Sequence, residues 1–303
     1  MADIAEDKSL GLTYASHQYG KHNRQKLGVW RFADRPAQTT GYWVVFIHGG
    51  AWRDPRNDEN DFTESIKRIV ISGAVAILDI AGFVSIDYRL SPHPDFPQES
   101  ATVKHPDHLE DIWSALNYLQ GKYELSNNYI LVGHSAGATL AFQLLMSGDI
   151  LASHPKGPLP IAIVGVSGIF DLVGLNDRHN GGYAGFIEAA FGDDKSAWEK
   201  ASPARFGSSF KDNWASGKLA MLAWSAEDTL IDEPEIDNMA SLLTEQGLKV
   251  EVNKHLRDEA IMRAPNKNTV PPQICAYTKL PFDLSRMAPA VGGPAKLANA
   301  EIV

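Results

Sequence analysis

The sequence has almost no cysteine, no long hydrophobic run and no excess of positive charge. Cys275 is the only cysteine, so the chain can form neither an internal disulfide nor a metal site built from thiolates. Asp79 interrupts the longest apolar stretch, residues 69–84, which falls short of the roughly 20 residues that span a bilayer. With 28 basic and 37 acidic residues, the net charge of −9 argues against nucleic acid or an anionic membrane as a partner.

The termini and the overall composition predict one domain with a tail. Residues 1–9 are acidic and polar and lack the apolar centre of a secretory signal, which together with the single cysteine favours a cytoplasmic location. Hydrophobic residues make up 44% of the 303 residues, enough for one large core. We expect a single domain over residues 1–262 and a loosely ordered tail over 263–303, where no amphipathic helix is evident.

Short apolar runs alternate along the chain with longer amphipathic stretches. Several of the runs expected to be strands are apolar almost throughout; the runs are residues 27–32, 42–47, 83–88, 129–132, 161–166, 219–224 and 249–252. Helices are expected over residues 106–120, 138–146 and 235–246. This alternation predicts an α/β fold with a mostly parallel central sheet and helices on both of its faces.

Two segments depart from the alternation. Residues 71–80 form an apolar insert that has no assigned place before the strand expected at 83–88. Residues 174–209 combine a glycine-rich turn with short helical stretches, which indicates a small helical insertion acting as a lid over the strand ends. An ordinary surface excursion is the alternative for that second segment.

The pentapeptide at residues 133–137, Gly-His-Ser-Ala-Gly, joins an apolar run to a helical stretch. A strand that ends in Gly-x-Ser-x-Gly and continues into a helix is typical of a nucleophile elbow, which exposes a catalytic serine, here Ser135. The first amides of the helix then face the hydroxyl and can stabilise charge on an acyl oxygen. A tight turn with a capping serine is the alternative.

A second glycine-rich loop follows the apolar run at 42–47 and reads His48-Gly49-Gly50-Ala51-Trp52. In hydrolases with such an elbow, a loop of this type supplies part of the oxyanion hole. We expect the N–H groups of Gly49 or Gly50 and of Ala136 to bind the oxyanion. A plain Gly-Gly turn between a strand and a helix is the alternative.

A serine hydroxyl needs a base, and the base needs an acid that orients it; in this fold the chain order is serine, acid, histidine. His255 is the only histidine beyond residue 228 and follows the last expected strand, so it is the candidate base. Asp228 is the candidate acid because it follows the run at 219–224, with Glu227 and Asp232 as rivals.

The remaining histidines fit catalysis less well. His105 and His108 stand three residues apart at a helix start without acidic partners, so we expect surface residues and no metal site. His48 is expected to shape the oxyanion loop by hydrogen bonding, and Asp87 to belong to a structural network.

These motifs resemble those of kynurenine formamidase (arylformamidase), a serine hydrolase of the α/β-hydrolase fold. The loop at 48–52 matches the family's His-Gly-Gly-x-Trp signature, and the likeness to fungal members extends over about residues 20–256 with gaps. Further matching segments are residues 87–92, 105–108, 133–137 and 225–228. The chain departs from the pattern after its last strand: the family has His-Asp in a glycine-containing loop, whereas residues 254–259 read Lys-His-Leu-Arg-Asp-Glu.

The resemblance implies hydrolysis of N-formyl-L-kynurenine to L-kynurenine and formate, in tryptophan degradation toward NAD. It implies Ser135 as nucleophile, Asp228 as acid and His255 as base, with no cofactor; a homodimer is compatible with it. Trp52 and Phe186 are the aromatic side chains expected beside the substrate ring. Two other functions stay open: a carboxylesterase acting on small acyl esters, and a catalytically impaired hydrolase that serves as a binding protein.

Overall fold

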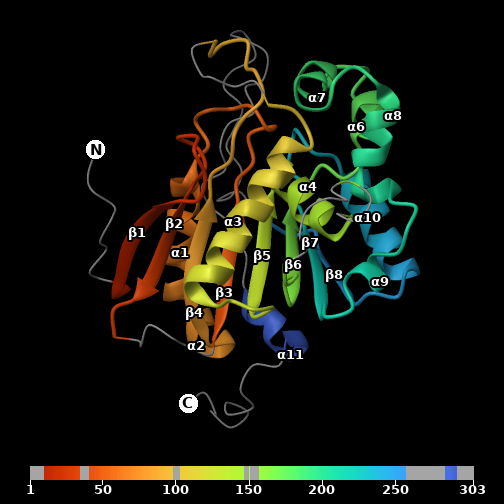
Figure 1. The fold of residues 1–303 in the computed structure, drawn as a ribbon. Helices are drawn as coiled ribbons and strands as arrows, with labels where there is room; N and C mark the ends of the chain where they lie inside the picture. The colour runs from red at the N-terminus through yellow and green to blue at the C-terminus, as the bar shows by residue number, and fades with distance from the viewer. Residues whose placement is uncertain are drawn as a thin grey trace.

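The computed structural model describes residues 10–34, 41–97, 103–146, 150, 157–256 and 284–291. Within these residues eight strands form one sheet in the order β1-β2-β4-β3-β5-β6-β7-β8 (Figure 1). β2 runs antiparallel to both of its neighbours, and every other pairing in the sheet is parallel. The strands are β1 (Leu12–Gln18), β2 (Lys26–Phe32), β3 (Tyr42–Ile47), β4 (Ile80–Ile86), β5 (Tyr129–His134), β6 (Ala162–Val166), β7 (Leu219–Ala223) and β8 (Val250–Asn253).

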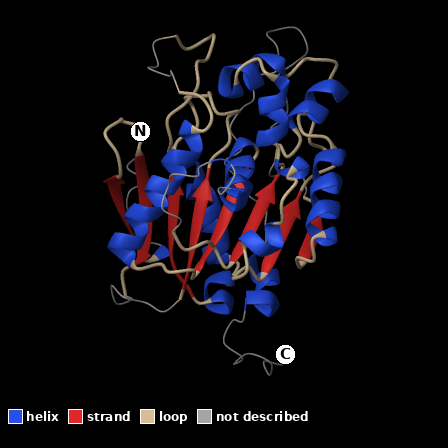
Figure 2. Ribbon diagram, turned by 45° about the vertical axis from the view of Figure 1, so that its right-hand side comes forward, coloured by secondary structure: helices blue, strands red, loops and turns tan. Residues whose placement is uncertain are grey.

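Helices connect the parallel strands and cover both faces of the sheet (Figure 2). The α-helices are α1 (Thr63–Ile71), α2 (Ala74–Leu78), α3 (Asp107–Tyr123), α4 (Ala136–Gln143), α6 (Leu172–Arg178), α7 (Ala184–Phe191), α8 (Lys195–Ala201), α9 (Phe210–Asn213), α10 (Glu233–Glu245) and α11 (Ala288–Val291). The 3-10 helices are η2 (Glu59–Phe62), η3 (Leu144–Met146), η4 (Pro203–Arg205) and η6 (Leu284–Met287).

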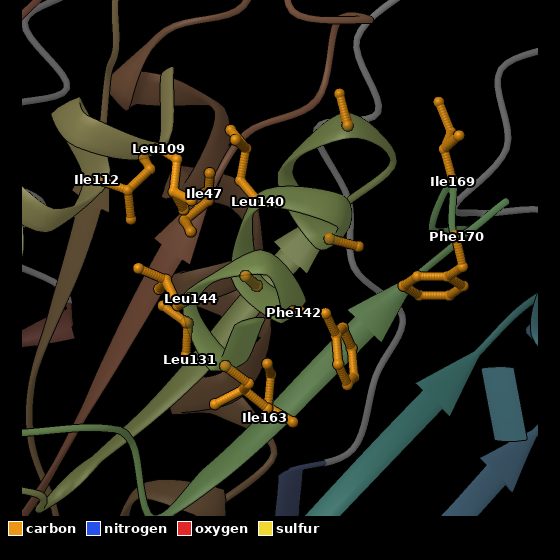
Figure 3. Close-up of a cluster of buried hydrophobic side chains, with 14 of the residues drawn as sticks. Ile47, Leu109, Ile112, Leu131, Leu140, Phe142, Leu144, Ile163, Ile169 and Phe170 are labelled. Atoms are coloured by element: carbon orange, nitrogen blue, oxygen red, sulfur yellow. The ribbon is translucent and has the colours of Figure 1, made fainter. Parts of the chain in front are cut away.

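Two hydrophobic clusters lie on opposite faces of the sheet, because successive strand residues point to opposite sides. In β3, Val45 and Ile47 belong to the cluster that α3, α4 and α10 cover. Val44 and Phe46 belong to the second cluster, which α1 and α2 cover. Figure 3 shows the first cluster, where α4 lies across β5 and β6 and the rings of Phe142 and Phe170 approach each other. The expected parallel sheet with helices on both faces is therefore confirmed.

The expected strands all form, with small shifts at their ends, and one more strand appears. β1 was not expected because its sequence, LTYASHQ, is polar and half exposed, as suits a strand at the sheet edge. The structure also shows which elements the apolar residues 71–80 form. They contain the end of α1, a left-handed turn at Gly73, the short helix α2 and the first residue of β4. Ala74, Leu78 and Ile80 are buried in the second cluster, whereas Ile71 is exposed.

Part of the expected loosely ordered tail is folded, which corrects that expectation. Residues 284–291 form η6 and α11, and the side chains of Leu284, Met287 and Val291 are buried in the second cluster. The Tyr42 hydroxyl donates to the carbonyl oxygen of Val291 at 2.7 Å. In Figure 1 this segment lies below the amino ends of the strands. The other residues of the range 263–303 lie outside the described part.

The segment expected as a helical insertion, residues 174–209, contains most of α6 together with α7, α8 and η4. These helices lie above the carboxyl ends of the parallel strands, the edge where open α/β sheets hold their ligands (Figure 1). Among the described residues, no helix is both long and apolar enough to cross a lipid bilayer.

Candidate active site

Ser135 lies at a strained turn between β5 and α4. Its backbone has φ 51° and ψ −120°, a combination that side-chain-bearing residues rarely adopt. The Ser135 N–H donates to the carbonyl oxygen of Val166 on the neighbouring strand at 2.9 Å, which fixes the turn against β6. The residue is 6% exposed, so its hydroxyl faces a confined space rather than bulk water.

The two glycines of the pentapeptide are required by close packing. A Cβ at Gly133 would lie 2.4 Å from the carbonyl oxygen of Gly137. A Cβ at Gly137 would lie 2.2 Å from the carbonyl oxygen of Ile47 in β3. Because both obstacles are backbone atoms, no side chain can be accommodated at either position. This geometry is the strand–turn–helix arrangement expected of a nucleophile elbow.

The glycine loop after β3 lies directly against this turn. A Cβ at Gly49 would stand 3.1 Å from the Cβ of Ser135 and 2.9 Å from Nδ1 of His134. Gly50 adopts a positive φ of 87° and packs against the side chain of Asn57. Among the described residues, the backbone N–H groups of Gly49, Gly50 and Ala136 donate no hydrogen bond, so they are available to a ligand oxygen.

A buried polar network lies behind the loop. Nε2 of His48 is 3.2 Å from Oδ1 of Asp87, and the same carboxylate oxygen pairs with Arg24 at 3.0 Å. Nδ1 of His48 also lies 3.0 Å from the carbonyl oxygen of Gly49, so the imidazole contacts the loop, while its role in an oxyanion hole stays a prediction. Asp87 lies in a network of buried polar side chains, as expected. Asp61 lies near this network, and its carboxylate accepts from Nδ2 of Asn57 at 2.6 Å. Burial raises the pKa of Asp61 to about 6, although the nearby His48 opposes the rise.

A small pocket opens beside Ser135. Its polar lining comes from His134, Ser135, Ser167 and Asp228. Its apolar lining comes from Ile169, Tyr183, Phe186, Leu230 and Ile231. Tyr183 and Phe186 belong to the helical insertion, so this segment forms one wall of the pocket, as a lid would.

Trp52 occupies a different position from the one expected. It is fully buried and does not line the pocket beside Ser135. Its ring packs on Phe186 and Phe191, with centroids 6.2 Å and 4.9 Å away. Trp52 therefore supports the pocket wall from behind, while Phe186 has the expected place in the wall itself.

His108 is buried and His105 is half-buried, which corrects the expectation of surface residues. The ring of His105 packs on Phe191, and Nε2 of His108 is 3.0 Å from the Ser91 hydroxyl. Burial lowers the pKa of His105 to about 4 and that of His108 to about 3. Among the described residues, no three histidine, cysteine or acidic side chains converge as a metal site would require.

The candidate acid lies at the pocket, whereas the candidate base lies outside it. Asp228 lines the pocket with Ser135, and its Oδ1 accepts from the N–H groups of Leu230 and Ile231 at 2.9 and 3.0 Å. His255 is exposed, and its ring makes no hydrogen bond within the described residues. Its backbone forms an isolated bridge with Ser225, three residues before Asp228, so the two candidates stand on neighbouring segments.

The rivals of Asp228 lie outside the pocket. Asp232 is paired with Arg178, whose Nε donates to Oδ2 at 2.6 Å, and Glu227 is exposed. Sequence reasoning missed Tyr183 as a pocket residue. The only available signal was its position in the insertion, since one aromatic residue in a glycine-rich turn has no spacing pattern.

Taken together, a strained serine after a parallel strand, a glycine loop packed against it and a pocket at the carboxyl edge define a hydrolase of the α/β-hydrolase fold. Solved structures agree on the fold. Esterase B from Lactobacillus Rhamnosis matches with a TM-score of 0.62 at 16% identity, covering 81% of this chain and 75% of that chain. A bacterial esterase/lipase matches with a TM-score of 0.58 at 16% identity, covering 83% and 75%.

The BD-FAE family model matches residues 33–209, more than half of the chain. Kynurenine formamidase-like hydrolase fscH from Fusarium equiseti is 40% identical over 229 residues, covering 70% of this chain and 73% of its own. The kynurenine formamidase of Meyerozyma guilliermondii is 34% identical over 241 residues, covering 79% and 83%. The chain belongs to the BD-FAE family of α/β-hydrolases and, within it, to the kynurenine formamidases.

Proposed function

We propose that this protein hydrolyses the formamide bond of N-formyl-L-kynurenine, releasing L-kynurenine and formate. The names of its fungal relatives support this substrate. The single structural observation that carries the proposal is Ser135, held at φ 51° in the pocket, with unused N–H groups from Gly49, Gly50 and Ala136 on its loop and helix. A nucleophile beside preorganised N–H donors is the equipment that acyl transfer requires.

The residues around the site support a formyl group and an aromatic leaving group. The formyl carbon carries only hydrogen, so the acyl side of the site needs little room, which suits the tight packing of Gly49 on Ser135. On the other side, the rings of Tyr183 and Phe186 offer faces on which an aryl amine can pack.

In the proposed mechanism Ser135 attacks the formyl carbon while His255 takes its proton and Asp228 orients the imidazole. The oxyanion binds the free N–H groups, each worth roughly 3 kcal/mol in the transition state. The aryl amine leaves with the proton from the imidazole, and water then releases formate from Ser135. Since His255 is exposed, its ring must turn toward the pocket for this step.

The decisive experiment replaces Ser135 with alanine. The variant should still bind N-formyl-L-kynurenine, while its turnover falls by several orders of magnitude, measured as kynurenine formation at saturating substrate. Activity close to that of the wild type would refute the mechanism. The assay should include 4-nitrophenyl acetate, because faster ester than formamide hydrolysis would favour a carboxylesterase.

The exposure of His255 favours a second candidate function, a catalytically impaired hydrolase that binds small molecules. His255→Gln separates the two. If His255 is the base, kcat should fall by about 10³-fold or more at pH 7. If the wild type neither turns over substrate nor reacts with a fluorophosphonate at Ser135, the binding function is the better description.

A further inference from the structure

The buried phenol of Tyr88 contacts the glycine loop at residues 48–52, called the oxyanion loop below. Tyr88 is fully buried, and its hydroxyl lies 3.1 Å from the carbonyl oxygen of Gly49 and 3.2 Å from that of His48. Both carbonyls can only accept, and the phenol has a single hydrogen, so the two oxygens share it. The carbonyl oxygen of Gly49 also lies 3.0 Å from Nδ1 of His48. Tyr88 does not line the pocket beside Ser135, and therefore acts on the loop rather than on a ligand.

The two carbonyls are the far ends of the peptide units that form the oxyanion hole. The carbonyl of His48 shares a planar unit with the N–H of Gly49, and the carbonyl of Gly49 shares one with the N–H of Gly50. In a trans peptide the C=O and N–H bonds point in opposite directions. A donor that fixes both carbonyls therefore also fixes the direction of both N–H groups, and it polarises them. These N–H groups belong to the loop that packs against Ser135.

The phenol itself has little freedom to move. Its ring stacks on the imidazole of His48, with centroids 4.3 Å apart and planes 11° apart. The N–H of Tyr88 donates to Oδ1 of Asp87 at 2.9 Å, and that carboxylate pairs with Arg24. Because no solvent reaches this layer, water offers no easy substitute for the hydroxyl as donor to the carbonyls.

We propose that Tyr88 is a positioning residue for catalysis, which sets the direction of the Gly49 and Gly50 N–H groups toward the oxyanion. The inference rests on the proposed acyl-transfer function of Ser135. Such a residue contributes mainly in the transition state, because the oxyanion forms only there. Its removal should therefore lower kcat and leave substrate binding nearly unchanged.

The test is Tyr88→Phe, which removes one oxygen and keeps the ring. We expect kcat to fall roughly tenfold to hundredfold with KM within about twofold, for both N-formyl-L-kynurenine and 4-nitrophenyl acetate. Inhibition by an aryl trifluoromethyl ketone, which forms an oxyanion on Ser135, should weaken by the same factor. Inhibition by L-kynurenine, which has no acyl group, should not change. Rates are expressed per fluorophosphonate-reactive site, so that only folded molecules are counted.

Tyr129→Phe is the matched control. Tyr129 is also fully buried, and its hydroxyl donates to the carbonyl oxygen of Pro158 at 2.9 Å, at the opposite end of β5 from Ser135. Both variants lose one buried hydrogen bond and should lose similar thermal stability. Only Tyr88→Phe should lose kcat.

An unchanged kcat in Tyr88→Phe, an equal loss in both variants, or a loss confined to KM would overturn the inference. If Tyr88→Phe yields no folded protein, Tyr19→Phe is the variant that tests the proposal. The Tyr19 hydroxyl donates to the carbonyl oxygen of Asp87 at 2.6 Å, in the peptide unit that leads into Tyr88. It should give a smaller fall in kcat at constant KM, and its failure to do so contradicts the proposal. Wild-type protein inactive on both substrates would refute the proposed function itself, and the inference with it.

Discussion

At the scale of single residues, the backbone strain of the site lies at the candidate nucleophile, Ser135. Ser135 holds a positive φ that costs on the order of 1–3 kcal/mol, and packing from both sides keeps it there. The hydrogen bond from its N–H to Val166 anchors the turn to the sheet. The strain is therefore imposed by the neighbouring strands and not by the five residues of the motif alone.

A buried carboxyl makes the stability of the fold depend on pH. Burial raises the pKa of Asp61 from 3.8 to about 6, so the folded state favours its protonated form. The unfolded chain releases this proton at lower pH, so stability falls as the pH rises from about 4 through 6 and then levels off. At neutral pH the cost is on the order of 2–3 kcal/mol.

Asp61→Asn removes this cost while keeping an acceptor for Asn57, whose Nδ2 donates to Asp61 Oδ2 at 2.6 Å. Urea unfolding should show the variant about 2 kcal/mol more stable than the wild type at pH 8 and equal to it near pH 4. A difference that is the same at both pH values would contradict the assignment.

At the scale of elements, the contact between α4 and β3 aligns the elbow with the oxyanion loop. The Cα of Gly137 faces the backbone of Ile47 and His48, where a Cβ would meet their carbonyl oxygens at 2.2 and 2.5 Å. The helix can approach the strand this closely only through glycine, and the approach sets the distance between Ser135 and Gly49.

Gly137→Ala should therefore force α4 away from β3. We expect a loss of about 3 kcal/mol or more in the free energy of unfolding, together with a large loss of kcat in the remaining folded protein. Gly121→Ala is the control, because Gly121 is exposed in α3 and a Cβ there meets nothing within 4 Å. That change should stabilise the protein by about 0.5–1 kcal/mol. Denaturant unfolding and initial rates measure both effects, and equal stability of the two variants would refute the packing argument.

The sequence predicts a strand best where the strand is buried on both faces, because burial there requires apolar residues. β3 and β6 are apolar throughout and β5 is apolar up to His134, so their positions could be predicted from composition alone. The polar edge strand β1 carries no such signal, because its stability comes from pairing with β2.

In the site, too, the local motifs could be predicted from the sequence, whereas contacts between distant parts of the chain could not. The elbow and the glycine loop have fixed local spacing, so their residues could be named from the sequence. The burial of Trp52 could not, because it depends on Phe186 and Phe191, more than 130 positions away in the chain. For His255 the order of the motifs predicted a role, whereas its exposure depends on the path of the chain after β8.

At the scale of the whole molecule, the helical insertion is fastened to the sheet domain beside the site. Arg178 in α6 donates to Asp232 and to the buried Glu235 at the start of α10. Glu235 also accepts from the N–H groups of Phe170 and Asp171 at 2.5 and 2.7 Å. The wall that contains Tyr183 is thus held to the sheet domain by ionic contacts at one end.

The opposite end of the molecule is closed by residues 284–291, far from the site. η6 packs against α2, and Met287 is fully buried in the second hydrophobic cluster. In Figure 1 the segment lies at the amino ends of the strands, while α7 lies at the carboxyl ends. It should therefore contribute to stability and not to catalysis.

Met287→Ala tests this separation of roles. The lost contacts and the cavity left behind should lower the free energy of unfolding by about 2–5 kcal/mol. The kcat and KM per fluorophosphonate-reactive site should equal those of the wild type, because the pocket at the other sheet edge keeps its shape. Ile71→Ala is the control: Ile71 is 76% exposed at the end of α1, and its truncation should change stability by no more than about 0.5 kcal/mol. Equal stability of the two variants would mean that residues 284–291 do not pack on the core in solution. A changed kcat in Met287→Ala would mean that a change at the amino ends of the strands alters the site at their carboxyl ends.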